Sequence, residues 1–468
     1  MEKITLGVIF GNRDFFPSHL VSTARKDIAA VFEELNLDAV ILDEKETVFG
    51  SVENYQHSKA CAELFAANRD RIDGILVVLP NFGDEKGIAD AIKLSGLRVP
   101  IMVQAYPDDT ELFDVANRRD AYCGKISVCN NLRQYGYAYT LTDLHTVHPS
   151  EDSFKKDLYR FSRVCKVVRK LENVRLGSVG ARPQAFNTVR YSEKLLQEAG
   201  ITVITADLSE IMGEAGRMKD SDAPVKAKLD DIRAYLPANG VPSDAVVRMA
   251  KFGAALDSWM KEFDVQATAL QCWNSVQKNF GINVCTLMSM MSESLMPSAC
   301  EVDVTGVLSM YSLQLATGKP AALVDWNNNY KKDPDKCVLF HCGNWAKSFY
   351  EEARMEYANI LATTLGQENT YGAINGNVAA GPMSFARVST DDSYGIIRAY
   401  VGDGAFTDDP LDTFGSRAVV QIPGLQDLMK YVCKNGFEHH AAITPALSSE
   451  ILAEAFETYK GWDVYKHS

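Results

Sequence analysis

Long apolar runs and long basic runs are both missing from this sequence of 468 residues. No apolar stretch approaches the roughly 20 residues that a membrane-spanning helix needs, so a membrane span is not expected. Lys and Arg number 48 against 61 Asp and Glu, for a formal net charge of −13. Because an acidic surface repels phosphates, we expect neither nucleic acid nor an anionic membrane as a partner.

Cysteine motifs and secretion signals are also lacking. The ten cysteines form no regular framework and no C-x-x-C pair occurs. The N-terminal Ile-Thr-Leu-Gly-Val pattern, followed by charge at Arg13 and Asp14, is typical of a first strand and not of a signal peptide. We therefore expect reduced thiols and a cytoplasmic location.

Several catalytic fingerprints are absent as well. The sequence has no G-x-G-x-x-G, no G-x-S-x-G and no H-E-x-x-H. Gly376 and Gly381 have the spacing of a P-loop, but Pro382 stands where the phosphate-binding Lys is required. These absences argue against a nucleotide enzyme, a serine hydrolase of the elbow type and a zincin protease.

Short strand-like runs alternate with amphipathic helical segments from the N-terminus onward, which predicts parallel, doubly wound sheets. We predict an α/β fold with two such domains, at residues 1–172 and 173–346, followed by a β-rich domain at 347–468. The third domain is expected to open with a helix over SFYEEARMEYANILATTLG. The clearest expected strands are Ile4–Phe10, Ala39–Leu42, Gly74–Leu79, Ile101–Gln104, Arg175–Val179, Thr202–Ala206, Val265–Leu270, Ala321–Val324 and Cys337–Phe340.

Ligands of open α/β sheets bind beyond the carboxyl ends of the strands, so the residues there deserve most weight. Glu301 stands just before a predicted helix that Gly318 ends, and the next strand delivers Asp325 to the same edge. Cys337–Phe340 would deliver His341 there if that strand is also parallel. Two carboxylates and an imidazole suit a divalent cation such as Mn²⁺.

Each of these residues also has an ordinary structural explanation. Glu301 could complement a helix dipole, Asp325 could be a turn residue, and His341 could be a satisfied half-buried histidine. Neighbours in an extended segment point in opposite directions, so only one of His439 and His440 is expected to be a ligand. A structural zinc at Cys337, His341 and Cys342 is disfavoured, because a fourth partner is missing.

The motifs CEVDVTG, VDW, FHCGNW and FEHHAAI, in that order, resemble the L-fucose/L-arabinose isomerase family. FGNRDFFP, LPNFGDE and GARPQAF resemble substrate-domain segments of the same group. The resemblance implies a metal-dependent aldose-ketose isomerase, a hexamer, and Mn²⁺ held by Glu301, Asp325 and His440, with His341 as another candidate ligand. In such an assembly, first-domain residues would act on the pocket of a neighbouring subunit.

An isomerase of this kind moves a proton between C1 and C2 of an open-chain sugar, and Glu301 and Asp325 are the candidates for this acid–base work. L-Fucose, D-arabinose and a modified hexose such as sulfoquinovose are candidate substrates. Arginines suit a charged substituent, although each could instead form an ordinary ion pair. The candidate sugar-binding residues are Arg13, Asn81, Gln104, Arg182, Trp273 and His439.

Two other classes of function stay open at this point. A sugar-binding protein without catalysis would also have two doubly wound domains around a cleft. A metal-dependent aldolase or hydrolase could use a similar set of ligands. The first would bind sugar without turnover, and the second would release cleavage products instead of an isomer.

Overall fold

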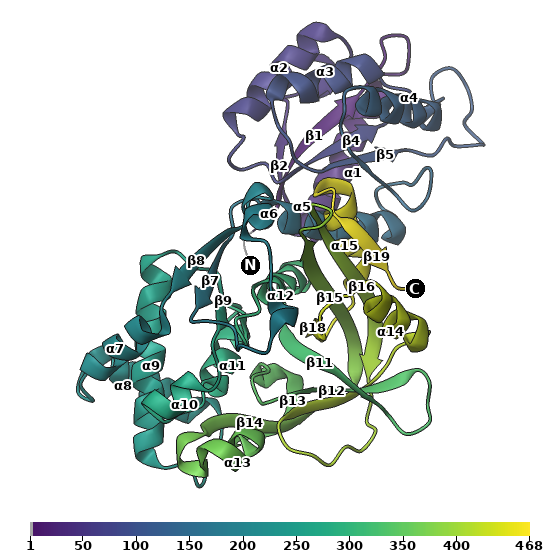
Figure 1. Ribbon diagram of the computed structural model, residues 1–468. Coiled ribbons are helices and arrows are strands. Elements are labelled where there is room, and N and C mark those ends of the chain that lie inside the picture. Colours follow the sequence, from purple (N-terminus) through teal and green to yellow (C-terminus); the bar gives the residue numbers. More distant parts are fainter. Residues whose placement is uncertain (1–2) are drawn as a thin grey trace. The chain divides into compact units, whose positions relative to one another are not determined.

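A computed structural model describes residues 3–468 and divides the chain into two compact units. The first unit comprises residues 1–169 with 458–460, and the second comprises 170–457 with 461–468. Figure 1 shows helices packed against sheets in each unit. Among the described residues, no helix combines the length and the apolar character needed to cross a membrane.

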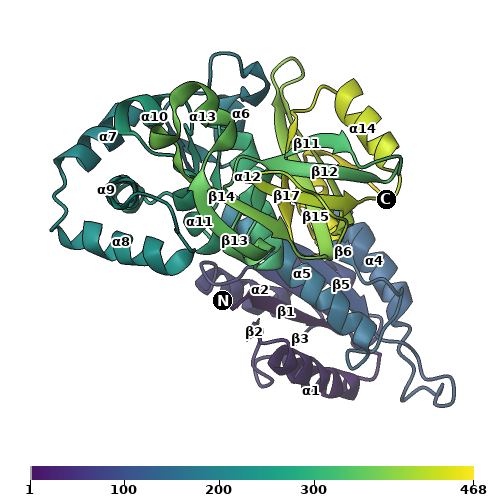
Figure 2. The same ribbon diagram turned by 90° about the horizontal axis from the view of Figure 1, so that it is seen from below.

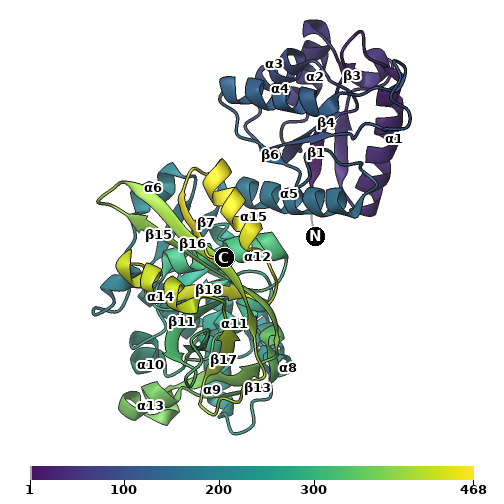
Figure 3. The same cartoon turned by 90° about the vertical axis from the view of Figure 1, so that its right-hand side faces the viewer.

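A six-stranded parallel sheet forms the centre of the first unit. Apolar residues alternate along its strands: Leu6, Val8 and Phe10 pack on one face, and Ile9 packs on the other. α1 and α5 cover the first face, and α2, α3 and α4 cover the second (Figure 3). The prediction of a doubly wound parallel sheet is confirmed for this unit. Its elements are β1 (Thr5–Gly11), α1 (His19–Glu34), β2 (Asp38–Ile41), β3 (Ser51–Val52), α2 (Tyr55–Ala67), β4 (Gly74–Leu79), α3 (Glu85–Ser95), β5 (Ile101–Ala105), α4 (Ala121–Gln134), β6 (Thr140–Leu141) and α5 (Asp152–Leu171).

The second unit begins with a smaller parallel sheet, in the order β10-β9-β7-β8. A large cluster of buried apolar side chains, with Phe252 and Leu256 among them, joins this sheet to its helices. The second predicted α/β cycle is therefore present. Its elements are β7 (Arg175–Val179), α6 (Glu193–Glu198), β8 (Thr202–Ala206), α7 (Leu208–Arg217), α8 (Ala223–Tyr235), α9 (Ser243–Glu262), β9 (Ala267–Leu270), α10 (Ser275–Phe280), α11 (Cys285–Glu293), β10 (Ser298–Ala299) and α12 (Val304–Thr317).

A nine-stranded, mostly antiparallel sheet completes the second unit. In Figure 2, β11, β12 and β17 run side by side in this sheet, and α14 packs its apolar side chains, such as Leu428, against it. The prediction of a β-rich C-terminal region is confirmed. The elements are β11 (Ala322–Asn329), β12 (Lys336–His341), β13 (Tyr350–Tyr357), α13 (Asn359–Leu365), β14 (Tyr371–Val378), β15 (Gly381–Asp391), β16 (Ile396–Phe406), β17 (Ser416–Gln421), α14 (Leu425–Lys434), β18 (His440–Thr444), α15 (Ser449–Ala453) and β19 (Asp463–Lys466).

Two expectations for the second unit are wrong. β11 and β12 do not extend the parallel sheet; they pair antiparallel to each other within the nine-stranded sheet, and β11 continues past Asp325 to Asn329. The helix expected to open the C-terminal region is wrong in its first half, which is strand β13, and is present only in its second half, as α13. Glu, Ala, Arg and Met are good helix formers, but tertiary contacts routinely override such local preference, and here the segment pairs antiparallel with β14.

Helix α12 contacts both sheets of the second unit: β7, β9 and β10 on one side, and β15 and β18 on the other. The sequence indicates one apolar face, but Val304 to Ala316 are all buried, as expected for a helix covered all round. Gly318 ends the helix in a left-handed conformation at φ 72°, as predicted. Because α12 is enclosed in this way, the residues at its N-terminus are held inside the unit.

Gly124 allows α4 to approach the loop after β4 in the first unit. A Cβ atom built there would lie 1.7 Å from the carbonyl oxygen of Phe82. We expect Gly124→Ala to lower the free energy of unfolding by about 1–3 kcal/mol, measured by urea denaturation, because the helix must move away. Gly216→Ala is the matched control, since this helical glycine has no atom within 4 Å of its added methyl group. Equal effects at the two glycines would contradict the close approach.

Candidate active site

Glu301 lies in a tight turn between β10 and α12. The backbone N–H of Asp303 donates to the carbonyl of Cys300 at 3.0 Å and closes the turn. Both central residues, Glu301 (φ 57°) and Val302 (φ 58°), have the positive φ of a type I′ turn. A left-handed valine is strained by the order of 1 kcal/mol or more. Because such strain persists where the surroundings demand one particular geometry, the turn marks a candidate functional position.

The Glu301 carboxylate is buried, and its two oxygens have different surroundings. Oε1 accepts a hydrogen bond from Nε1 of Trp273 at 2.8 Å. Oε2 is buried without a hydrogen bond of normal geometry, and lies 3.6 Å from Nε2 of His341 and 3.7 Å from Nε2 of His440. Burial raises the pKa of Glu301, but the nearby histidines outweigh it, so the pKa lies below its usual value.

Asp325 and His440 are brought together by strand register. They stand directly opposite each other on β11 and β18, so their side chains share one face of the sheet. Nε2 of His440 lies 3.4 Å from Oδ1 of Asp325. His440 therefore lies close to both predicted carboxylate ligands, Glu301 and Asp325.

His439 also faces Asp325, with its Nε2 at 3.4 Å from Oδ1. The expectation that the two neighbouring histidines point in opposite directions is wrong, because β18 begins at His440 and His439 lies outside the strand. The two rings differ in exposure: the side chain of His439 is 41% exposed, and that of His440 is 1% exposed. His440 is therefore the better placed of the two for a buried site.

A buried chain of contacts orients His440. Its Nδ1 lies 2.8 Å from Oδ2 of Asp303, whose carboxylate in turn accepts two hydrogen bonds from the Arg387 guanidinium at 2.5 and 3.0 Å. A proton on Nδ1 facing Asp303 leaves the Nε2 lone pair turned toward Glu301 and Asp325. Burial raises the pKa of Asp303, but Arg387 and His440 outweigh it and hold this pKa far below its usual range.

Asp303 and Arg387 were missed by the sequence reasoning. Asp303 could have been predicted as a helix cap, because Asp directly before a helix is a preferred N-cap residue. In the structure its side chain accepts a hydrogen bond from the N–H of Gly306 at 2.8 Å. Arg387 is 84 residues further along the chain and has no comparable signal. Its partner Glu438, two residues before His440, adds a third buried charge at 3.2 Å from Nε of Arg387.

His341 has a different hydrogen-bonding pattern. Its Nδ1 accepts from the backbone N–H of Cys342 at 2.9 Å, which places the ring proton on Nε2, toward Glu301. The geometry thus favours a donor to Glu301 over a lone-pair ligand.

A pocket of about 260 Å³ opens at these residues, at the small end of the range for small-molecule sites. Phe186 packs edge-on against Trp273 and His439 in its wall. Carboxylates and imidazoles thus line the same cavity as aromatic and aliphatic side chains. The lining residues are Phe186, Trp273, Glu301, Asp325, Phe340, His341, Cys342, Ile360, Leu361, His439 and His440.

The other predicted sugar-binding residues do not line this pocket. Arg13, Asn81 and Gln104 belong to the first unit: Arg13 is ion-paired with Glu85, Asn81 hydrogen-bonds Asn12, and Gln104 donates to the carbonyl of Val147. Arg182, in the second unit, is on the loop that also carries Phe186, and its guanidinium lies 3.5 Å from the carbonyl of Pro183.

The buried Arg387–Asp303 pair generates a stability prediction. Asp303→Asn keeps the helix cap but leaves a buried guanidinium short of a countercharge, so we expect the free energy of unfolding to fall by about 3–5 kcal/mol at pH 7 in urea. Because the pKa of Asp303 is lowered in the folded state, its stabilisation is present above the unfolded pKa of about 3.9 and is lost as pH falls below it. The difference between wild type and variant should therefore shrink from pH 5 to pH 3.

Asp207→Asn is the matched control, since Asp207 caps α7 in the same way but is exposed. We expect this variant to keep the unfolding midpoint of the wild type. A loss at Asp303 no larger than that at Asp207 would show that the buried pair does not support the site.

The sequences of known proteins match both ends of the chain. Residues 7–172 match the model of the fucose/sulfoquinovose isomerase N-terminal domain, and residues 339–468 match that of the L-fucose isomerase C-terminal domain. The two matched segments together cover more than half of the chain and include Asp303's partner Arg387, both His439 and His440, and His341.

Four similar proteins carry the name sulfoquinovose isomerase, among them those from Clostridium sp., Alkalicoccus urumqiensis and Priestia aryabhattai. The one from Clostridium sp. is 28% identical over 49% of this chain and 51% of its own length, and the one from Alkalicoccus urumqiensis is 27% identical over 64% and 66%. The one from Priestia aryabhattai is 24% identical over 72% and 74%. The chain thus aligns with about half to three quarters of each relative. From the two domain matches, the chain belongs to the fucose/sulfoquinovose isomerase family.

Proposed function

We propose that the protein is an aldose-ketose isomerase that works on an open-chain sugar with a bound divalent cation, Mn²⁺ first among them. The observation that carries the proposal is the convergence of Glu301, Asp325 and the oriented Nε2 of His440 in a pocket that aromatic side chains also line. Family membership supports the same class of reaction.

The side chains at the site fit a divalent cation. Oε2 of Glu301 is a buried carboxylate oxygen without a hydrogen bond of normal geometry, and a lowered pKa keeps it ionised. Ligand atoms of Glu301, His341 and His440 lie within 4.8 Å of one another, as do those of Asp325, His439 and His440. Mixed carboxylate and imidazole donors suit Mn²⁺. We propose Glu301, Asp325 and His440 as ligands, with His341 as the donor that orients Glu301.

The bound cation would supply electrophilic polarisation of the two sugar oxygens at which negative charge develops. The protein's own residues carry out the rest. Trp273 Nε1 donates to Oε1 of Glu301 and fixes the carboxylate, with Oε2 turned toward His341 and His440. Glu301 and Asp325 are placed to take a proton from one sugar carbon and return it to the neighbouring one. Phe186 and Trp273 exclude water from one side of the pocket.

Sulfoquinovose is the first sugar to test, because the similar proteins carry its name. L-Fucose, D-arabinose and L-arabinose complete the panel. No Lys or Arg lines the described pocket, so a sulfonate would have to meet a cation from beyond these lining residues, and Arg182 and Arg13 are the candidates. We also propose that the protein acts as a homo-oligomer, a hexamer by family likeness, and that it works in the cytoplasm.

Substitution of Glu301 tests the chemistry directly. We expect Glu301→Gln to fold normally, by circular dichroism, and to form ketose from the sugar panel at least about 100-fold more slowly, since the amide cannot accept the proton. Glu351→Gln, on an exposed part of β13, should keep wild-type activity. Ketose and cleavage products are both measured by NMR. Full activity of Glu301→Gln would overturn the proposal, and cleavage products would favour an aldolase or a hydrolase.

We expect substitutions of His440 and of His341 to weaken metal binding by different amounts. After removal of metal with EDTA, we expect Mn²⁺ titration to restore activity in the wild-type protein. His440→Gln should weaken Mn²⁺ binding, followed calorimetrically, by more than about 100-fold, because a ligand is lost. His341→Gln should weaken it by about tenfold or less, because only the orientation of Glu301 is lost. Equal losses would refute the donor role of His341.

A further inference from the structure

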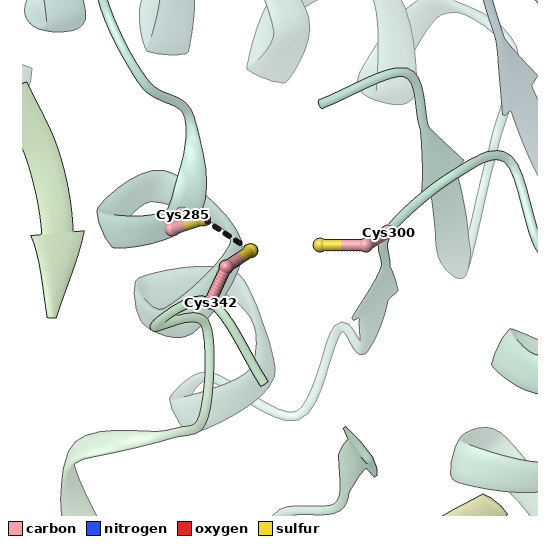
Figure 4. A group of neighbouring side chains, drawn as sticks. All are labelled: Cys285, Cys300 and Cys342. Carbon is pink, nitrogen blue, oxygen red and sulfur yellow. Dashed lines mark hydrogen bonds between the residues drawn. The ribbon is translucent and has the colours of Figure 1, made fainter. Parts of the chain in front are cut away.

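Three thiols converge beside the active site but take no part in the proposed isomerisation. Cys285 is the first residue of α11, Cys300 follows β10, and Cys342 follows β12. Figure 4 shows their sulfur atoms turned toward one another from three separate elements. The three Sγ atoms lie within 4.8 Å of one another, and those of Cys285 and Cys342 are 3.6 Å apart.

These separations match those of thiolates around a single metal ion. Ligand sulfurs that each lie about 2.3 Å from a common ion are about 4 Å apart from one another. A disulfide would need an S–S distance of about 2.05 Å, so the 3.6 Å pair is a contact between separate thiols. The cluster needs only a small contraction or expansion to enclose an ion.

Sulfur atoms predominate around the cluster, and a carboxylate oxygen of Glu301 lies within 4.8 Å of Sγ of Cys300. Sδ of Met288 lies 3.9 Å from Sγ of Cys300, and the amide of Asn344 donates to the same sulfur at 3.2 Å. Cys285 and Cys300 are fully buried. Cys342 lines the sugar pocket, which gives an ion a route from solvent to the sulfurs.

We propose that Cys285, Cys300 and Cys342 form a site for a soft, thiophilic metal ion, Cu(I), next to the isomerase centre. Thiolate and thioether ligands select Cu(I), whereas zinc in proteins usually takes four ligands. This cluster offers three thiols, because the fourth thiol near Cys300, that of Cys272, is not grouped with Cys285 and Cys342 and donates to Oε1 of Glu301 at 3.5 Å. Each coordinating thiol releases its proton to the solvent as the ion binds. No electron transfer is involved, because the ion arrives and stays as Cu(I).

Chain connectivity links this site to the active site. Cys300 directly precedes Glu301, and Cys342 directly follows His341 and donates its N–H to that ring. A contraction of the sulfurs around an ion pulls on both peptides. Cu(I) loading therefore inhibits the isomerase. This second part rests on the proposed function, whereas metal binding itself does not.

Binding is tested by competition. Protein stripped with EDTA and reduced with a phosphine under argon is titrated with Cu(I) held by bicinchoninate, and the loss of the coloured chelate is measured. We expect one Cu(I) per chain in the wild type, and at least roughly 100-fold weaker binding in Cys285→Ser, because a ligand is removed. Cys337→Ser is the matched control, since Cys337 is also buried in this unit but is not part of the cluster. Its affinity should equal that of the wild type.

X-ray absorption tests the copper site, and activity measurements test the inhibition of the isomerase separately. X-ray absorption of the loaded wild type should show three sulfur neighbours around copper; nitrogen or oxygen neighbours, or equal affinity in Cys285→Ala and wild type, would overturn the site. Loaded wild type should lose isomerase activity that loaded Cys285→Ser keeps, and an equal loss in both would overturn the coupling. Absence of activity in the metal-replete, copper-free wild type would count against the proposed function and leave the binding result standing.

Discussion

The buried ion pair between Arg387 and Asp303 is the interaction on which the active site depends. Both side chains are completely buried, and two charges taken out of water are stable only if they are well paired. The pair ties the start of α12 to the middle of β15, and through Asp303 it also holds the ring of His440 on β18. One carboxylate thus caps a helix, neutralises an arginine and orients the proposed ligand histidine.

This arrangement explains why the turn at Glu301 can be strained. α12 packs between the two sheets of the second unit. Its N-cap residue, Asp303, is held to β15 by the hydrogen bonds from Arg387. With the chain held at Asp303 and at β10, Glu301 and Val302 close the turn in left-handed conformations. Packing along the whole of α12 offsets the strain of these conformations. The carboxylate of Glu301 is thereby held in a fixed position facing the pocket.

Patterns that are local in the sequence predicted much of the fold. The strands at Gly74–Leu79, Arg175–Val179 and Thr202–Ala206 have the predicted bounds, because buried parallel strands are short apolar runs between turn residues. Strand β13 was mistaken for a helix, since pairing with a distant strand outweighs local preference. Glu301, Asp325 and His440 do converge, but Asp325 and His440 do so through antiparallel register and not at the expected parallel edge, and Glu301 comes from the turn after β10. Arg387 could not be found, because its partner Asp303 is 84 residues away in the sequence and on a different element.

The same turn carries a hard and a soft donor on adjacent residues, and a carboxylate oxygen of Glu301 lies within 4.8 Å of Sγ of Cys300. Glu301 faces the histidines with a hard oxygen donor, while Cys300 before it faces other thiols with a soft sulfur. His341 and Cys342 repeat this division on β12. Because hard and soft donors prefer different ions, the two clusters need not compete for the same metal. The strained turn at Glu301 therefore sets both the geometry of the proposed manganese site and its distance from the thiols behind it.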